Sequence, residues 1–326
     1  MNIVKALKYI IAFLFTALIS SSVHAQVDAQ FSQYWAVPGY YNAGAIGNTD
    51  FINVHAVSRL QWVGIPKAPV TFSAMGDMPF KFFGKRFGTG LVLTQESMGL
   101  YSSINACAQI AYKKKLFKGE LGIGVQIGFL NETFKGSKVV LPSDDDYHQG
   151  TDPGIPTSDL SGSALDVSAG IFYSHKYFWL GLSGTHLTQP TVNLSADSNQ
   201  DKIYEFQAGR IFYFMGGSNI QIKNTLFELQ PSVLVKTDTQ FFMAEATIRT
   251  TYRKFLSGGI GYRWKDAVSV MIGADYKNFT LGYCFDYPLS NISKASTGSH
   301  EVFIGYKVKL DLGDKNKNKH KSIRIM

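Results

Sequence analysis

Apolar and polar residues alternate in short segments that repeat from near residue 49 to residue 312. Between Phe279 and Tyr287, for example, every odd position is large and apolar, whereas every even position is small or polar. Successive side chains of a β-strand point to opposite faces, so such a segment has one face suited to lipid and one suited to a polar interior. The pattern predicts transmembrane β-strands.

Together with turn chemistry, the alternation predicts an all-β fold, a transmembrane antiparallel β-barrel of about 14 strands with an N-terminal plug segment. An even strand number places both chain ends on the periplasmic side. The three longest connections, near 135–162, 188–200 and 288–298, then all lie on the outer side, as is usual for outer-membrane barrels. The expected strands cover residues 49–62, 69–79, 87–97, 102–115, 118–134, 163–174, 177–187, 201–214, 221–237, 240–252, 255–264, 267–276, 278–287 and 299–312.

The first 25 residues have the features of an export signal. Lys5 and Lys8 give a positive start, an apolar run extends from Tyr9 to Ile19, and small residues precede Gln26. The alternative is an N-terminal membrane anchor, but the apolar run is shorter than the roughly 20 residues of a spanning helix. We therefore expect a cleaved signal peptide and a multi-pass β-barrel in the cell outer membrane. The expected segments are a signal peptide at 1–25, a plug or periplasmic segment at 26–48, the barrel at 49–312 and a basic periplasmic tail at 313–326.

A barrel of about 14 strands is wider than its own side chains can fill. The segment 26–48 is aromatic and glycine-rich and lacks alternation. We expect it to fold into the barrel, although a periplasmic extension is the alternative. The plug residues that would pack in the lumen are Gln30, Phe31, Gln33, Tyr34 and Trp35.

Charged residues fall on the polar phase of several later strands, where they would face the lumen. We expect a charge network that rigidifies the wall or holds the plug, with an ion-selective pore as the alternative. Glu245 and Arg249 are four residues apart on one strand and therefore share a face. The expected network residues are Glu245, Arg249, Arg263, Asp275 and Asp286, and Glu205 and Glu228 lie on the same phase.

Composition agrees with a membrane barrel, since 17% of residues are charged, against about a quarter in a typical soluble protein. The net charge is +8, and much of it lies in the segment 315–324, which we expect to be solvated, with docking on anionic lipid or on a periplasmic partner as the alternative. Nucleic acid is not an expected ligand of an exported chain. The two cysteines, Cys107 and Cys284, fall on polar phases far apart in strand order, so we interpret them as small interior residues.

Candidate chemistry is weak throughout the chain, so we expect no catalytic site, no metal site, no cofactor and no enzyme activity. Ser183 and His186 are three apart on an expected strand, which would point their side chains to opposite faces. The glycines between 122 and 128 alternate with apolar residues and precede no helix that would hold a phosphate. The longest outer loop is expected to be a partner-recognition loop, because it is polar and carries five acidic residues without calcium-loop spacing: Asp144, Asp145, Asp146, Asp152 and Asp159.

Several short segments resemble, in order, the PorP/SprF family of type IX secretion system membrane proteins. The segments that carry the resemblance are Asp28–Tyr34, Asn42–Gly47, Arg59–Trp62, Thr71–Ser73, Asp77–Pro79, Tyr262–Ala267, Gly282–Pro288 and Gly298–Glu301. The chain departs from the family pattern at Ala43, where proline is usual, and at Cys284, where serine is usual.

The resemblance implies a non-enzymatic outer-membrane component of the type IX secretion system. Its expected partners are membrane lipid and either the ring lipoproteins and a peptidoglycan-binding protein of the machine, or a large secreted adhesin with a C-terminal sorting domain. The expected function is to support secretion and cell-surface attachment of such adhesins, including those used in gliding motility. The alternative is an outer-membrane transport barrel or channel for hydrophobic molecules or small solutes.

Overall fold

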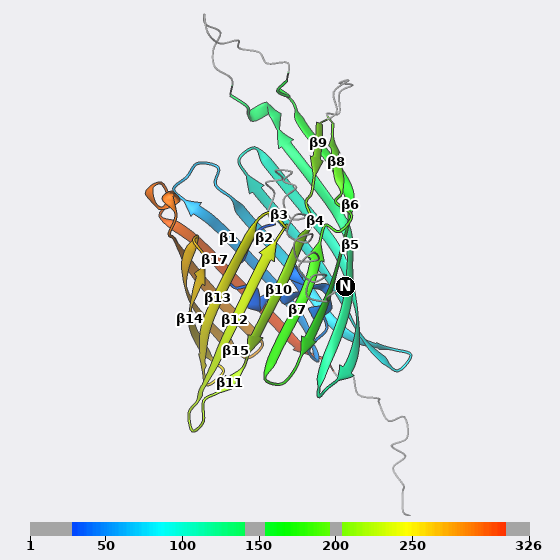
Figure 1. Ribbon diagram of the computed structural model, residues 1–326, viewed down its shortest axis with the longest axis vertical. Helices are drawn as coiled ribbons and strands as arrows, with labels where there is room; N and C mark the ends of the chain where they lie inside the picture. Colours follow the sequence, from blue (N-terminus) through cyan, green and yellow to red (C-terminus); the bar gives the residue numbers. More distant parts are fainter. Residues whose placement is uncertain (1–27, 141–153, 196–203, 311–326) are drawn as a thin grey trace, which may run out of the picture.

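The computed structural model describes residues 28–140, 154–195 and 204–310, which form a closed antiparallel β-barrel of 14 strands (Figure 1). The barrel strands are β1 (Phe51–Val63), β2 (Val70–Phe82), β3 (Lys85–Met98), β4 (Tyr101–Leu116), β5 (Gly119–Lys135), β6 (Asp159–Ser174), β7 (Phe178–Thr185), β10 (Ile211–Ser218), β12 (Phe227–Thr237), β13 (Phe242–Tyr252), β14 (Leu256–Arg263), β15 (Ala267–Tyr276), β16 (Phe279–Pro288) and β17 (Gly298–Lys309). The expected fold is confirmed.

Each barrel strand pairs with its neighbours along the chain, and the first strand closes the ring by pairing with the last. Phe51 of β1 lies opposite Lys309 of β17, and the register continues to Leu60 opposite His300 before a bulge. Closure leaves no open sheet edge along this seam. Strands that cross lipid require such closure, because the backbone polar groups of an open edge would have no hydrogen-bond partners there.

The two faces of the wall follow the alternation. On β15, the side chain of Ile272 is 61% exposed, whereas those of Ser269 and Met271 on the opposite phase are 0% and 2% exposed. On β16, Leu281 is exposed and Cys284 is buried. The apolar phase therefore forms the outer face of the barrel, where it meets lipid.

The one large difference from the expected strands lies between β7 and β12. The expected strand 201–214 is divided in two: β9 (Tyr204–Gln207) pairs with β8 (Thr191–Leu194), and β10 enters the barrel wall only at Ile211. Arg210 lies in the break and its Nε donates to the carbonyl of Leu187 at 2.9 Å. The β8–β9 hairpin lies at the outer end of the barrel (Figure 1), where Val192 and Leu194 pack on Leu130 and Leu160.

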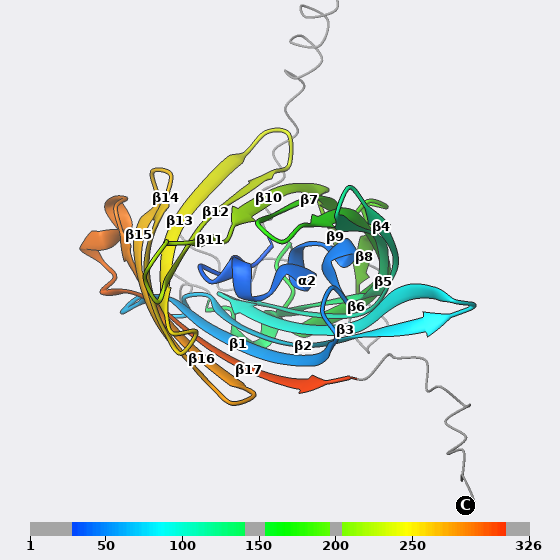
Figure 2. The same cartoon turned by 90° about the horizontal axis from the view of Figure 1, so that it is seen from below.

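The segment 28–48 lies inside the barrel, as the view along the barrel shows (Figure 2), and we call it the plug. It contains three short helical elements, η1 (Tyr34–Ala36), α2 (Pro38–Tyr41) and η2 (Ala43–Ala45). The remaining elements are η3 (Gly136–Lys138), η4 (Asn291–Lys294) and the two-residue strand β11 (Ile220–Gln221), which pairs with β12. Among the helices of the described ranges, none is long and apolar enough to cross a membrane.

The main core of the molecule is the contact between the plug and the inner wall. Phe31, Tyr34, Val37 and Tyr41 of the plug are each at most 1% exposed. They belong to one cluster with buried residues of the wall, namely Val57, Met75, Val92, Cys107, Phe172, Ile211, Tyr213, Met215, Leu234 and Phe303. The plug therefore fills the wide lumen with the apolar contacts that a smaller barrel would make between its own strands.

Glycines let the plug backbone approach the wall closely. A Cβ on Gly124 of β5 would lie 2.3 Å from the backbone of Ala43, and one on Gly170 of β6 would lie 2.2 Å from the Asn42 side chain. Asn42 uses this proximity to donate from Nδ2 to the carbonyls of Ile171 and Leu182, at 3.0 and 3.1 Å. Gly122 and Gly124 of β5 and Gly170 of β6 are thus a glycine docking surface for the plug.

Candidate functional site

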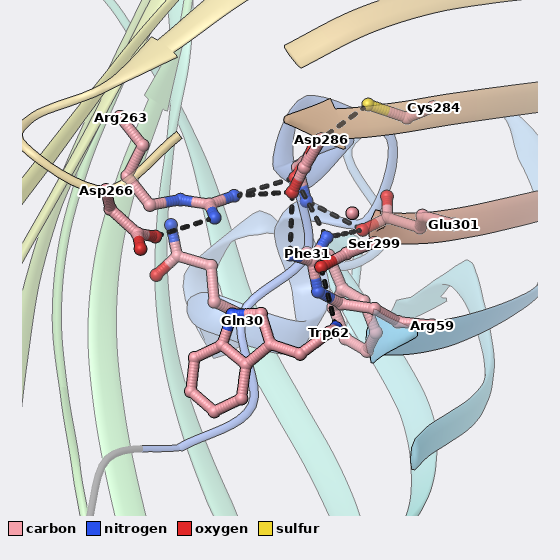
Figure 3. A network of polar contacts seen from close by, with 12 residues as sticks. Gln30, Phe31, Arg59, Trp62, Arg263, Asp266, Cys284, Asp286, Ser299 and Glu301 are labelled. Carbon is pink, nitrogen blue, oxygen red and sulfur yellow. Dashed lines mark hydrogen bonds and ion pairs between the residues drawn. The ribbon is translucent and has the colours of Figure 1, made fainter. Parts of the chain in front are cut away.

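A buried polar network joins the plug to the barrel wall, where Arg59, Asp286 and Glu301 lie close together (Figure 3). Ser32 of the plug is at the centre of this network. The Ser32 hydroxyl donates to Asp286 Oδ2 at 2.7 Å. It accepts from Arg59 Nη1 at 2.9 Å and from Arg263 Nη2 at 2.7 Å. The two guanidinium groups also contact Asp286 directly, at 2.6 and 3.3 Å. Residues from β1, β14 and β16 therefore converge on one serine of the plug.

Two glutamates extend this network along the wall. Glu301 of β17 pairs with Arg59 at 3.1 Å and accepts the backbone N–H groups of Ser32 and Gln33 at 2.7 and 2.8 Å. Glu245 of β13 pairs with Arg263 at 2.9 Å and accepts from the Gln30 side chain at 2.8 Å. We call Ser32, Arg59, Glu245, Arg263, Asp286 and Glu301 the Ser32 network.

The wall supplies more buried carboxylates than cations at this point. Asp286, Glu245 and Glu301 are at most 2% exposed and face two buried guanidinium groups, while Asp266, which also contacts Arg263, is partly exposed. A buried carboxylate needs donors for its remaining lone pairs. The plug provides them from the Ser32 and Gln33 backbone and from the Gln30 and Ser32 side chains. Removal of the plug would take these donors away from the three carboxylates.

A second polar cluster fixes the start of the plug on the opposite wall. Asp28 lies 2.9 Å from His186 Nε2 and accepts from Tyr213 and Thr185 at 2.9 and 3.1 Å. His186 Nδ1 lies 3.1 Å from Asp166 of β6, so the imidazole is held between two carboxylates.

Charge pairing decides the protonation of this cluster. Burial by itself raises the pKa of Asp28, but His186 and Lys236 outweigh it and hold the pKa well below its usual range. Burial by itself lowers the pKa of His186, but the carboxylates of Asp28 and Asp166 raise it to about 11. At neutral pH the plug is therefore attached by a carboxylate and an imidazolium ion.

Other plug residues contact nearly every part of the inner wall. Gln109 Nε2 and Lys113 Nζ of β4 donate to the carbonyls of Gly39 and Gly44, both at 2.8 Å. The Tyr34 hydroxyl lies 2.9 Å from Ser232 Oγ of β12. Burial raises the pKa of Tyr34, so its hydroxyl stays protonated.

The structure separates the expected charge network into two places. Glu245, Arg263 and Asp286 belong to the Ser32 network, and Gln30, Phe31, Gln33 and Tyr34 lie in the plug beside it. Arg249 instead lies under the indole ring of Trp35, 3.3 Å from the ring centroid, and bonds to Gln230. Asp275 accepts from Thr280. Both lie nearer the periplasmic end, on the wall of a separate cavity.

Two other expected lumen charges lie elsewhere or have local partners. Glu205 is on the outer hairpin strand β9 and is exposed, because the chain leaves the barrel wall before β10. Glu228 of β12 accepts from Gln230 at 3.0 Å.

Cys107 and Cys284 are both free and buried, on β4 and β16.

The acidic outer loop is described only in part. Asp144, Asp145, Asp146 and Asp152 lie outside the described residues. Asp159 is the exposed first residue of β6 and accepts from the backbone and hydroxyl of Ser137 at 3.1 and 2.6 Å. Within the described ranges, no group of three or more acidic, histidine or cysteine residues is placed to hold a metal ion.

The expectation that Ser183 and His186 face opposite sides is wrong. Both contact the plug, since Ser183 donates to the Tyr41 carbonyl at 2.6 Å and His186 contacts Asp28. The strand β7 ends at Thr185, and His186 has a φ of 51°, which turns its side chain back to the lumen. The Ser183 hydroxyl is therefore committed to a backbone carbonyl.

Cavities lie on both sides of the plug. The outer cavity, of about 400 Å³, reaches from Asp28 and Tyr40 of the plug to Met98 and Tyr101 at the outer ends of β3 and β4. A groove of about 1020 Å³ lies at the opposite end and is mostly basic. Its charged lining residues are Asp50, Lys81, Lys85, Arg86, Lys113, Lys114, Lys115, Glu120 and Lys309.

The family model described as type IX secretion system membrane protein PorP/SprF matches residues 23–306, which includes every strand of the barrel except the end of β17. The chain belongs to the PorP/SprF family. The family and the closed barrel together make it an outer-membrane protein. The match also starts before the plug, so plug and barrel are both parts of the family's common region.

Solved structures with some likeness to this PorP/SprF chain include a toluene transporter, a monoaromatic hydrocarbon channel and a FadL homologue. The Ralstonia pickettii toluene transporter TbuX is 12% identical, with a TM-score of 0.45 over 83% of this chain and 92% of that chain. The CymD monoaromatic hydrocarbon channel is 8% identical, with a TM-score of 0.48 over 88% and 95%. A Pseudomonas aeruginosa FadL homologue is 11% identical, with a TM-score of 0.44 over 83% and 93%. No curated protein matches the chain.

The segments that resemble the family meet in the Ser32 network. Arg59, Arg263, Asp286 and Glu301 come from four separate segments of that resemblance, and all contact Ser32 of a fifth. Arg59 and Glu301 were absent from the expected network, although both are charges within predicted strands. Asp166, His186 and Lys236 were also missed, and their position opposite Asp28 depends on strand neighbours that no short motif reveals.

Proposed function

We propose that this PorP/SprF protein is a closed, non-enzymatic binding barrel of the type IX secretion system. Its outer end holds a secreted surface protein and its periplasmic end engages the secretion apparatus. The observation that carries the proposal is the plug. Polar contacts tie it to β1, β4, β7, β10, β12, β13, β14, β16 and β17, so it is attached around the whole ring rather than to one wall.

A barrel closed in this way is suited to presenting surfaces on both sides of the membrane. The outer end carries the β8–β9 hairpin, the extended ends of β5 and β6 and the outer cavity. We infer that these elements recognise the secreted partner, an adhesin with a C-terminal sorting domain, and thereby support secretion, surface attachment and, for motile cells, gliding.

The periplasmic end carries the basic groove, with Lys114 and Lys115 exposed on β4. A surface of one charge sign favours partners of the opposite sign and increases their association rate. We infer that an acidic surface of the ring lipoproteins or of the peptidoglycan-binding protein docks there.

Identification of the proteins that co-purify with the chain tests this proposal. A peptide tag inserted between Thr239 and Gln240, in the exposed outer turn between β12 and β13, avoids the plug and both cavities. The tagged protein is purified from native outer membranes in mild detergent, with an untagged strain as the control. Mass spectrometry is expected to find secretion-machine proteins, a large C-terminally sorted adhesin, or both. Recovery of neither would overturn the proposal.

A transport barrel is the second candidate, because part of the outer cavity is apolar, with Val92, Leu130 and Ile211 in its lining. Conductance of the purified protein in planar bilayers separates the two functions. The binding barrel is expected to be closed, whereas steady conductance or uptake of a hydrophobic solute by reconstituted protein would favour transport.

A further inference from the structure

The outer cavity is lined by more negative charge than its cations balance. Four carboxylates line it, those of Asp28, Glu96, Glu132 and Asp166, and His186 lies between the first and the last. Lys236 is close by, with its Nζ 3.0 Å from the Asp28 carbonyl. One imidazolium ion and one ammonium ion therefore face four carboxylates.

Glu96 and Glu132 are the two acids that remain without a cation. Hydroxyl groups of Thr71 and Ser103 are their hydrogen-bond neighbours. Neither glutamate forms an ion pair within the described part of the chain. Glu132 is 4% exposed, and a carboxylate so enclosed is costly to keep charged unless an opposite charge or a donor reaches it.

Asp166 adds an independent indication of a missing partner. Its side chain is 1% exposed and lines the cavity, and its Oδ2 contacts His186. Its Oδ1 has no hydrogen-bond partner among the described residues. Buried polar atoms in native proteins almost always have partners, so an open acceptor on a cavity wall indicates a donor that comes from outside the chain.

The volume and lining of the cavity fit a long cationic side chain better than a bare ion. No group of three ligating side chains is placed to hold a metal in the described ranges. The volume of about 400 Å³ lies in the range of pockets for organic ligands. Met98, Tyr101 and Phe206 line the outer part, where they would contact the methylene groups of arginine or lysine while the charged end reaches the acids below.

We propose that the outer cavity binds one basic side chain, arginine or lysine, of an extended segment of the secreted partner that enters from the outer side. The proposal rests on the proposed function, because it names the chemistry by which the outer end recognises its partner. The guanidinium or ammonium group would donate to Asp166 Oδ1 and offset part of the negative charge of Glu132 and Glu96. The floor of the site is the plug residue Asp28, so a bound cation also stabilises the docked plug.

Two short peptides test the site on the full-length protein in detergent at low salt. Acetyl-Gly-Arg-Gly-amide carries the cation, and acetyl-Gly-citrulline-Gly-amide is its neutral near-isostere. Calorimetry is expected to show saturable binding of the arginine peptide and about tenfold weaker binding of the citrulline peptide, because charge-assisted hydrogen bonds are lost. Equal binding of the two peptides, or no saturable binding of the arginine peptide, would overturn the proposal.

Variants locate the binding within the barrel. Glu132→Gln and Glu96→Gln are each expected to weaken binding of the arginine peptide about tenfold, since each removes one charge from the site. Glu205→Gln makes the same change on the exposed outer strand β9 and is expected to leave the affinity unchanged. The shift in gel mobility on heating shows whether each variant forms the barrel. If one variant fails to form it, the other variant and the two peptides still decide. Unchanged affinity in a folded variant would overturn the assignment.

Surface display in cells separates this proposal from the proposed function. If the folded variants lose the arginine peptide and also display less of the secreted protein, both proposals are supported. Normal display with peptide binding absent in the wild type would remove the cation site and leave the binding function in place. If the purified protein binds the arginine peptide but no secreted protein depends on the barrel in cells, the site is supported and the proposed function is contradicted.

Discussion

Asp28 Oδ1 lies 2.9 Å from His186 Nε2, and this ion pair joins the first described residue of the plug to the outer end of β7. The two residues are 158 positions apart in the sequence. It is therefore a tertiary contact that reports whether the plug is docked.

The pKa values of this pair predict how plug docking depends on pH. His186 has a raised pKa of about 11, so its contribution to stability is complete below pH 6.5 and is lost as the pH rises through 11. Asp28 has a lowered pKa, so its contribution is complete above pH 3.8 and is lost only as the pH falls through its folded value. We expect the melting temperature of the barrel in detergent to decline from pH 7 to pH 10. His186→Gln should remove this decline in melting temperature, whereas the control His175→Gln should keep it. An equal decline in both variants would contradict the assignment.

The Ser32 network predicts that loss of one wall carboxylate releases the plug. Asp286→Ala removes the carboxylate that Arg59, Arg263 and the Ser32 hydroxyl all contact, and loss of a buried hydrogen bond to a charged group costs about 1.5 to 3 kcal/mol. Cys284 is 0% exposed and lies beside Asp286, to which Ser32 of the plug donates, so its thiol is expected to become accessible when the plug leaves this part of the wall. In a Cys107→Ala background, Asp286→Ala is expected to increase the rate of maleimide labelling of Cys284 at least about tenfold. The change Asp238→Asn, at a half-buried position in the outer turn between β12 and β13, serves as the control and should leave labelling slow.

The glycine docking surface predicts a steric effect that needs no charge. A Cβ at Gly124 would lie 2.3 Å from the Ala43 backbone, whereas one at the exposed Gly258 would have its nearest neighbour at 3.8 Å. Gly124→Ala is expected to destabilise the protein by about 1 to 3 kcal/mol through overpacking. Gly258→Ala should be close to neutral. Thermal unfolding of the two variants measures the difference, and equal melting temperatures would show that the plug backbone does not rest on β5.

Strand positions could be predicted from the sequence because lipid imposes a strict period of two on the wall. The same reasoning did not predict where each lumen-facing side chain lies along the barrel axis. Glu245 and Arg249 share a face, but four residues separate them by about 13 Å along the strand, so only Glu245 reaches Arg263. Period-two reasoning also failed at His186, where a φ of 51° ends the extended backbone.

The plug contacts could be predicted only in kind. Charges on lumen phases indicated a network, yet which strand faces which depends on closure of the ring. Arg59 and Glu301 meet because β1 pairs with β17, with Arg59 directly opposite Glu301. Likewise, the expected strand 201–214 is divided because Ala208 to Arg210 leave the sheet. Arg210 marks the place in the sequence, since it shares a phase with Phe206 and Phe212, but that irregularity indicates a bulge or a position near the interface rather than a break.

The basic groove predicts charge-dependent docking at the periplasmic end. Lys114→Glu with Lys115→Glu reverses two exposed charges of β4 without touching Lys113, which holds the plug through Gly44. We expect the variant to form the barrel and to reach the membrane, but to recover several-fold less ring lipoprotein or peptidoglycan-binding protein when purified at low salt, because opposite charges there become like charges. Raising the salt concentration should also lower the amount of these partners recovered with the wild type.

The matched control Lys135→Glu with Lys138→Glu makes the same change on the outer side, at the end of β5 and in η3, and should recover the periplasmic partners normally. Equal loss in both variants would assign the effect to net charge rather than to the groove.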